Sequence, residues 1–194
     1  MTQHLLLALF AYLLGSVPTG LLLAKAFGVD IRSTGSGNIG ATNVYRTLGR
    51  SVGVLTLLGD CLKGVIPVIV TKQLDLPDVW IAAVGVAAFL GHVYTIFLGF
   101  KGGKGVATAL GVFIAVSPRA VLIALALFVA VVWIWRYISL GSITAAGAFP
   151  ILAFIVDGRP AIVAMTIIIS FLVIYKHKEN IQRLRSGTES KFKA

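Results

Sequence analysis

The sequence contains few charged residues, and acidic residues are the rarest among them. Charged residues make up 12% of the 194 residues, against roughly 25% in soluble domains. In contrast, 58% of the residues are hydrophobic and the mean hydropathy is +0.96. A chain this short cannot bury so much apolar surface in a core surrounded by water. The composition therefore excludes an ordinary soluble domain and indicates a protein that is solvated mainly by lipid.

Cysteine is almost absent, and acidic residues are scattered. The one cysteine, Cys61, cannot form an intramolecular disulfide and gives no metal-site spacing. Only Asp30, Glu179 and Glu189 fall in the loops that we assign below to the cytoplasmic side. They are too few and too far apart in sequence to surround a divalent cation with oxygen ligands. We therefore expect no metal ion.

Basic residues, by contrast, are abundant: 17 Lys and Arg residues against 7 Asp and Glu residues give a net charge of +10. In a soluble protein this excess would indicate nucleic-acid binding. Here the basic residues occupy short loops between apolar runs, which is typical of membrane topology signals that face anionic lipid. We expect membrane lipids, and no nucleic acid, as partners.

Seven apolar runs predict an all-α integral membrane protein with seven transmembrane helices. Crossing the hydrocarbon layer takes about 20 helical residues. No basic residue precedes the first run and six more runs follow it, so we interpret it as a retained helix and not a signal peptide. No repeat or long linker divides the chain, and we expect a single polytopic domain over residues 1–194. The runs are Leu5–Phe27, Val52–Val70, Val79–Phe97, Val106–Val116, Ala120–Trp135, Ser139–Val156 and Ala161–Tyr175.

The basic residues also predict the orientation. With seven spans, 13 basic residues lie on one face and three on the other, while Lys63 lies inside a span. The positive-inside rule makes the first face cytoplasmic, so the N-terminus is outside and the C-terminus inside. The run Val106–Val116 would cover only about 17 Å. We therefore expect the Gly-rich segment before it to dip into the membrane.

The first unusual cytoplasmic loop is Ser33–Asn43, followed by Arg46. Glycines at 35, 37 and 40 allow the backbone to approach a ligand and turn N–H groups toward it. The Arg46 guanidinium is suited to phosphate. The loop therefore predicts an anion site, although a flexible connector would also be rich in Gly and Ser. Its candidate binding residues are Ser36, Gly37, Asn38, Thr42 and Asn43.

The second loop, Gly99–Gly105, places Gly102, Gly103 and Lys104 at the start of a helix. Backbone N–H groups, the positive end of the helix dipole and an ammonium group would meet there, which favours anion binding. The segment lacks the P-loop pattern, and no strand precedes it, so nucleotide hydrolysis is not expected. Nearby His92 is open to two interpretations, a packed histidine or a catalytic one.

The third loop, His177–Glu189, follows the last run. His177 and Asn180 would share one face if the helix continued, although a basic tail that binds acidic lipid is the alternative. Ser142, at the start of the sixth run, could add a hydrogen bond. Asp60 and Lys63, three residues apart within a span, are interpreted as a structural ion pair.

These segments resemble the bacterial acyl-phosphate-dependent glycerol-3-phosphate acyltransferases (the PlsY family) over nearly the whole chain. Thr95 departs from the family pattern, where proline is expected after the aromatic residue. The matching segments are GSVPTG at 15–20, GSGNIGATN at 35–43 with Arg46, DCLKG at 60–64, GHVYTIFLGFKGGKGVAT at 91–108 and HKENIQRLRSGTE at 177–189.

The resemblance implies transfer of an acyl group from an acyl phosphate to glycerol 3-phosphate, which yields lysophosphatidic acid at the start of phospholipid synthesis. It implies a cytoplasmic-side site in the bacterial inner membrane, no cofactor, and an acyl-phosphate-producing enzyme as a possible partner. The substrate phosphate would act as the base. A transporter or channel for phosphorylated metabolites is the alternative. The implied catalytic residues are Ser36, Arg46, Lys104, His177 and Asn180, with Gly102, Gly103 and Ser142 among the substrate-binding residues.

Overall fold

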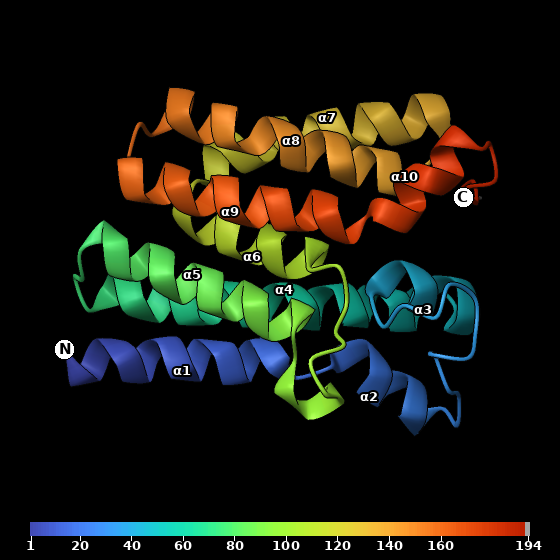
Figure 1. Cartoon of the computed structure of the whole chain (residues 1–194), viewed down its shortest axis with the longest axis horizontal. Helices are drawn as coiled ribbons and strands as arrows, with labels where there is room; N and C mark the ends of the chain where they lie inside the picture. The colour runs from blue at the N-terminus through green and yellow to red at the C-terminus, as the bar shows by residue number, and fades with distance from the viewer. Residues whose placement is uncertain (193–194) are drawn as a thin grey trace. The chain divides into compact units, whose positions relative to one another are not determined.

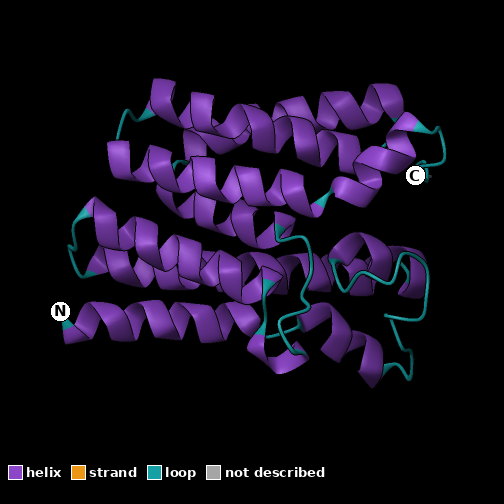
Figure 2. Ribbon diagram, viewed as in Figure 1, coloured by secondary structure: helices purple, strands orange, loops and turns teal. Residues whose placement is uncertain are grey.

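The computed structural model describes residues 1–192, which form ten α-helices, one 3-10 helix and no strand (Figures 1 and 2). The chain falls into two compact units, Met1–Ala115 and Val116–Ala194, each described by itself. The elements of the first unit are α1 (Thr2–Ser16), α2 (Thr19–Ala26), α3 (Ala41–Leu48), α4 (Arg50–Gln73), α5 (Asp78–Val93), η1 (Ile96–Leu98) and α6 (Val106–Val116), which ends one residue past the boundary. The elements of the second unit are α7 (Pro118–Trp135), α8 (Ile138–Val156), α9 (Pro160–Lys176) and α10 (Lys178–Arg185).

Apolar helices dominate the described residues, as the hydrophobic runs predict. Five segments are long and apolar enough to span a membrane: Thr2–Ala26, Arg50–Gln73, Asp78–Leu98, Pro118–Trp135 and Ile138–Val156. The pair α9 and α10 passes the same test together but is bent by 54°, and α6 is a shorter apolar helix of 11 residues. The all-α membrane fold is therefore confirmed. The count of seven spans, their orientation and the single domain stay predictions.

The first predicted run, Leu5–Phe27, is interrupted where the sequence contains Val17 and Pro18. α1 ends at Ser16, Val17 has an extended backbone with φ −60° and ψ 116°, and α2 begins at Thr19. Proline provides no N–H group and disfavours the helical conformation of the residue before it. The two helices together still satisfy the length and hydropathy of one span.

Small residues let the helices of the first unit approach closely. α1 and α5 lie side by side in Figure 1, and a methyl group added at Gly15 would overlap the backbone oxygen of Ala88. A methyl group at Gly111 on α6 would likewise overlap the backbone oxygen of Cys61 on α4. Because lipid provides little hydrophobic force between helices, such close packing is a main source of helix association in membranes.

Three long helices, α7, α8 and α9, pack side by side in the second unit (Figure 1). Phe149 on α8 and Met165 on α9 are each 2% exposed in its core. Large apolar side chains such as Trp133 and Phe171 are exposed, as expected for helix faces that contact lipid. The Ser117 hydroxyl, just before α7, donates a hydrogen bond to Asp157, just after α8.

Candidate functional site

The twelve residues predicted from the sequence divide between the two units. Ser142, His177 and Asn180 belong to the second unit. The other nine belong to the first unit: Ser36, Gly37, Asn38, Thr42, Asn43, Arg46, Gly102, Gly103 and Lys104.

Asn43 organises the first glycine-rich loop from inside it. Its side-chain Nδ2 donates to the backbone oxygens of Ile31, Thr34 and Asn38 at 3.2, 3.0 and 2.9 Å. Its Oδ1 accepts the Ser36 backbone N–H at 2.9 Å, and Asn43 as a whole is 2% exposed. The amide of Asn43 therefore builds the loop, and a direct bond from it to substrate stays a prediction.

The loop held by Asn43 presents polar side chains on its outside. Ser36 and Arg46 are exposed, and Thr42 is half-buried on the first turn of α3. Gly37 has a φ of +67°, in the left-handed region that side chains other than glycine rarely adopt. Asn38 accepts the Gly40 N–H at 2.8 Å and closes a local turn. The loop and the α3 helix that follows it therefore display the Ser36 hydroxyl and the Arg46 guanidinium group.

The second loop, Gly99–Gly105, folds back on the end of α5. The N–H groups of Gly102 and Gly103 donate to the backbone oxygens of Val93 and His92 at 3.1 and 3.2 Å. These amides are thus engaged within the chain, whereas the sequence led us to expect them to face a phosphate. α6 begins at Val106, just after half-buried Lys104. The N–H groups of its first turn have no acceptor within the helix and are therefore the groups at this loop that suit an anion.

Arg32 connects the two loops, although the sequence analysis did not select it as a site residue. Its Nη2 donates to the backbone oxygen of Lys101 at 2.6 Å, across 69 residues of sequence. The backbone N–H of Arg32 is itself bonded to Asp30 Oδ1 at 3.0 Å. The loops that carry Ser36 and Lys104 are therefore joined within one unit, and Arg46 follows on α3.

Thr95, where the resemblance predicts proline, has a backbone conformation that proline could also adopt. Its φ of −65° is a value that proline also adopts, and α5 has ended two residues before it. Its hydroxyl donates to the backbone oxygen of Ser16 at 2.6 Å, so the threonine adds a hydrogen bond between the end of α1 and this turn.

A buried ion pair lies behind the second loop. Lys63 Nζ is 2.9 Å from Asp60 Oδ1, as predicted from their spacing, and the same oxygen lies 3.8 Å from His92 Nδ1. Lys63 also donates to the backbone oxygen of Val17 at 2.8 Å, where α1 and α2 are interrupted. The side chains of Asp60, Lys63 and His92 are at most 4% exposed.

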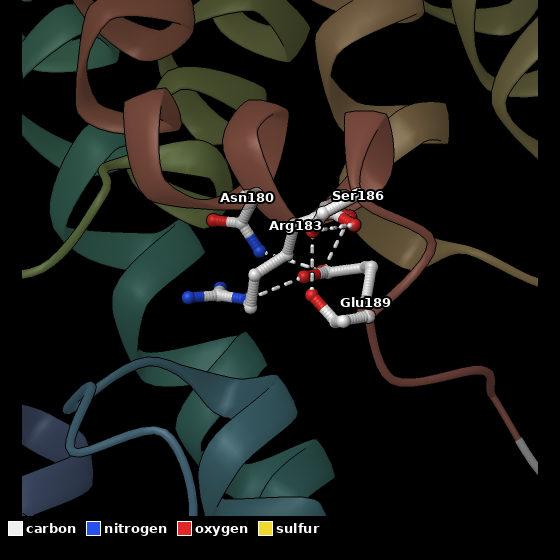
Figure 3. A network of polar contacts seen from close by, with 6 residues as sticks. Asn180, Arg183, Ser186 and Glu189 are labelled. Atoms are coloured by element: carbon white, nitrogen blue, oxygen red, sulfur yellow. Dashed lines mark hydrogen bonds and ion pairs between the residues drawn. The ribbon is translucent and has the colours of Figure 1, made fainter.

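In the second unit, Glu189 is the centre of a polar network (Figure 3). Its Oε1 accepts hydrogen bonds from Ser139 Oγ at 2.6 Å and Asn180 Nδ2 at 2.7 Å, and its Oε2 accepts one from Arg183 Nε at 2.7 Å. Burial acts to raise the pKa of Glu189, but the bonds from Ser139, Arg183 and Asn180 outweigh it. The pKa of Glu189 therefore lies below its ordinary value.

His177 and Asn180, predicted as catalytic, are both buried near this network. His177 lies at the 54° bend between α9 and α10, so the continuous helix that we considered is not formed. Its Nδ1 is 2.7 Å from the Val173 carbonyl, and because a carbonyl only accepts, Nδ1 bears the hydrogen. In the neutral ring Nε2 is then the atom that can accept a proton. The Ser142 hydroxyl donates to Ile138 O in its own helix at 2.9 Å, and its bond to substrate stays a prediction.

Sequence reasoning missed Arg32 and Glu189 as site-building residues. Glu189 appeared only as an isolated acid in a basic tail, although an acid amid Arg183, Arg185 and Lys191 is a signal of pairing. Arg32 has no such signal, because its partner is a backbone oxygen. Among residues 1–192, no group of three or more His, Cys, Asp or Glu side chains could hold a metal ion.

Comparison with known proteins gives consistent matches over the whole chain. A family model described as glycerol-3-phosphate acyltransferase matches residues 5–187. Relatives named glycerol-3-phosphate acyltransferase are 68% identical in Geobacter sulfurreducens and 66% identical in Geotalea daltonii, each over 100% of both chains.

Two crystal structures are also similar. Both are of PlsY (YgiH), described as an integral membrane glycerol 3-phosphate acyltransferase. The glycerol 3-phosphate form has a TM-score of 0.95 and 46% identity, and the lysophosphatidic acid form has a TM-score of 0.93 and 45% identity. Each comparison covers 98% of this chain and 96% of the other.

Proposed function

The chain belongs to the glycerol-3-phosphate acyltransferase family, and we propose that its acyl donor is an acyl phosphate. It would transfer the fatty acyl group to the 1-hydroxyl of glycerol 3-phosphate and form 1-acyl-glycerol 3-phosphate, that is, lysophosphatidic acid. The similar structures in glycerol 3-phosphate and lysophosphatidic acid forms support this acceptor and this product. Family membership also favours the enzyme over the transporter considered from the sequence.

The observation that carries the proposal is the junction of two glycine-rich loops by Arg32 and Lys101 in the first unit. The second loop bears the Lys104 ammonium, and α3, which follows the first loop, bears the Arg46 guanidinium; both groups are suited to phosphate. Both proposed substrates carry a phosphate. A donor with a compact phosphate leaving group needs no recognition of a nucleotide or a carrier protein.

We assign a role to each group of predicted residues. Ser36 and Lys104 contact the phosphate of the donor, and Arg46 contacts glycerol 3-phosphate. The other predicted residues of the first unit shape the two loops and provide further contacts to the substrates. They are Gly37, Asn38, Thr42, Asn43, Gly102 and Gly103. In this proposal the acyl phosphate is also contacted by three residues of the second unit, His177, Asn180 and Ser142.

The chemistry then requires no protein base. The glycerol 1-oxygen attacks the acyl carbonyl carbon, and the bond between that carbon and the phosphate oxygen breaks. The leaving phosphate takes the electron pair and accepts the hydroxyl proton. Lys104 and Arg46 stabilise the charge that develops on oxygen, which is the largest contribution in many acyl transfers.

The base assignment is tested by comparing His177→Gln with Lys104→Ala. If phosphate is the base, His177→Gln retains more activity than Lys104→Ala and keeps the pH profile of the wild type. A His177→Gln enzyme that is less active than Lys104→Ala and loses one limb of its pH profile would identify His177 as the base.

The donor is tested with purified protein in detergent, labelled glycerol 3-phosphate, and palmitoyl phosphate or palmitoyl-CoA in separate reactions. Labelled lysolipid formed with palmitoyl phosphate but not with palmitoyl-CoA supports the proposal. Equal product from palmitoyl-CoA would refute the donor assignment.

The proposal extends to location. We place the protein in the bacterial inner membrane as one polytopic domain, with seven spans, the N-terminus outside and the site on the cytoplasmic side. The excess of basic residues in the loops assigned to that side supports this orientation. An enzyme that produces acyl phosphate is the expected supplier of the donor.

Single cysteines placed at Ser36 and Asp157 in a Cys61→Ser background test the topology: an impermeant thiol reagent should label only position 157 in intact cells.

A further inference from the structure

His92 lies between a buried ion pair and the second glycine loop of the first unit. On one side of its ring, Nδ1 is 3.8 Å from Asp60 Oδ1, which is itself 2.9 Å from Lys63 Nζ. The side chains of all three residues are at most 4% exposed. Ionisable groups buried in a membrane-spanning helix are costly, so a helix that keeps them is expected to use them.

The other side of the ring faces Gly103. A methyl group built on Gly103 would overlap Nε2 of His92 and lie 3.2 Å from both Cδ2 and Cε1. These three ring atoms are its nearest neighbours. The Gly103 N–H also donates to the backbone oxygen of His92 at 3.2 Å. His92 therefore holds Gly103 through both its ring and its backbone.

We propose that His92 is a positioning residue for acyl transfer, which fixes Gly103 and, through it, the ammonium group of Lys104. Asp60 on α4 lies beside the ring, 3.8 Å from Nδ1, and Lys63 connects Asp60 to the break between α1 and α2 through its bond to Val17. The ring is buried, so it acts on substrate through the loop. The inference rests on the proposed role of Lys104 in binding phosphate.

The proposal has a kinetic signature. Lys104 directly follows Gly103, so a loosened loop displaces its ammonium group and weakens a contact to phosphate that is made both in the bound substrate and in the transition state. We expect His92→Ala to raise the KM of a phosphate substrate about tenfold while kcat changes less than about threefold. The pH profile should keep its shape because His92 exchanges no proton with substrate.

The experiment measures kcat and KM for palmitoyl phosphate and for glycerol 3-phosphate, together with thermal stability, in four variants. These are His92→Ala, His92→Gln, Gly103→Ala and the double variant His92→Ala/Gly103→Ala. His4→Ala is the matched control, because His4 stacks on Trp80 near the beginning of α5, whereas His92 lies in its last turn. His92→Gln keeps a polar side chain and is the conservative variant should His92→Ala fail to fold.

The double variant makes the contact itself testable. A methyl group at position 103 meets the ring in the single variant but enters the vacated space in the double variant. The double variant should therefore be no worse than His92→Ala, and its loss should be smaller than the product of the two single losses. His4→Ala should match the wild type.

Three results would overturn the proposal. The first is an unchanged KM for both substrates in His92→Ala and in His92→Gln. The second is a loss of kcat with the disappearance of one limb of the pH profile, since His92 would then be a catalytic acid or base. The third is a double variant whose loss equals the product of the single losses. Wild-type turnover of palmitoyl phosphate tests the donor separately, and the same ratios can be measured with whichever donor the wild type uses.

Discussion

The guanidinium group of Arg32 donates a 2.6 Å hydrogen bond to the backbone oxygen of Lys101, and this bond joins the two glycine-rich loops of the first unit. Residues 31–40 and 99–105 lie in neither a helix nor a strand. A connection between them therefore bears on how well Ser36, Arg46 and Lys104 are held.

Removing this connection should impair catalysis more than stability. We expect Arg32→Ala to lower kcat/KM for glycerol 3-phosphate about tenfold, because the loops lose their common anchor. The melting temperature should change little, since a single exposed hydrogen bond contributes about 1 kcal/mol. Arg50→Ala, which removes the same charge from an exposed position at the start of α4, is the control. Equal losses in the two variants would show that net charge, and not the bond, is responsible.

Glu189 should support both stability and activity. Glu189→Gln removes the negative charge that three donors share, and we expect a loss of about 1–3 kcal/mol in the free energy of unfolding. Activity should fall as well, because Asn180 loses its charged partner. Thermal unfolding and lysolipid formation measure the two effects. Glu179→Gln on the exposed side of α10 is the matched control, and an equal effect there would contradict the prediction.

The stability due to Glu189 should depend on pH with a defined sign. The pKa of Glu189 in the folded protein is below its ordinary value of about 4.5, so the unfolded chain binds the proton more readily. Its contribution is complete above about pH 4.5 and is lost as the pH falls through the lower, folded pKa. The difference in melting temperature between wild type and Glu189→Gln should therefore be constant from pH 7 to about pH 5 and shrink at more acidic pH. A difference that grows on acidification would contradict it.

The buried ion pair should be more sensitive to loss of one partner than to loss of both. Asp60→Asn leaves the Lys63 ammonium without its counter-ion, and breaking such a pair typically costs about 3–5 kcal/mol. The double variant Asp60→Asn/Lys63→Met should recover part of the melting temperature, because no uncompensated charge remains. If the double variant melts below the single variant, the pair itself and not the stranded charge is what stabilises the protein.

Much of the fold could be predicted because it depends on local composition. The short helix Val106–Val116 has the predicted bounds, and Asp60 and Lys63 pair as their spacing indicates. The run Leu5–Phe27 was wrong as one continuous helix, since hydropathy does not register that Pro18 interrupts the backbone hydrogen bonds.

The candidate site was less accessible from sequence. Asn43 has the composition of a ligand-binding residue, but its amide is directed to three backbone oxygens inside the loop. Arg32 likewise bonds to a backbone oxygen 69 residues away. Side-chain chemistry indicates which groups can bind phosphate, whereas the backbone partners that decide their use depend on tertiary structure.

The central claim, that acyl phosphate is the donor, is tested most directly by the stoichiometry of the reaction. Purified protein is given palmitoyl phosphate and glycerol 3-phosphate, and inorganic phosphate and lysophosphatidic acid are measured in the same samples. The account predicts one phosphate released for each lysophosphatidic acid formed, no release without glycerol 3-phosphate, and no product when palmitoyl-CoA replaces palmitoyl phosphate. Phosphate release without lysolipid, or lysolipid formed equally well from palmitoyl-CoA, would contradict it.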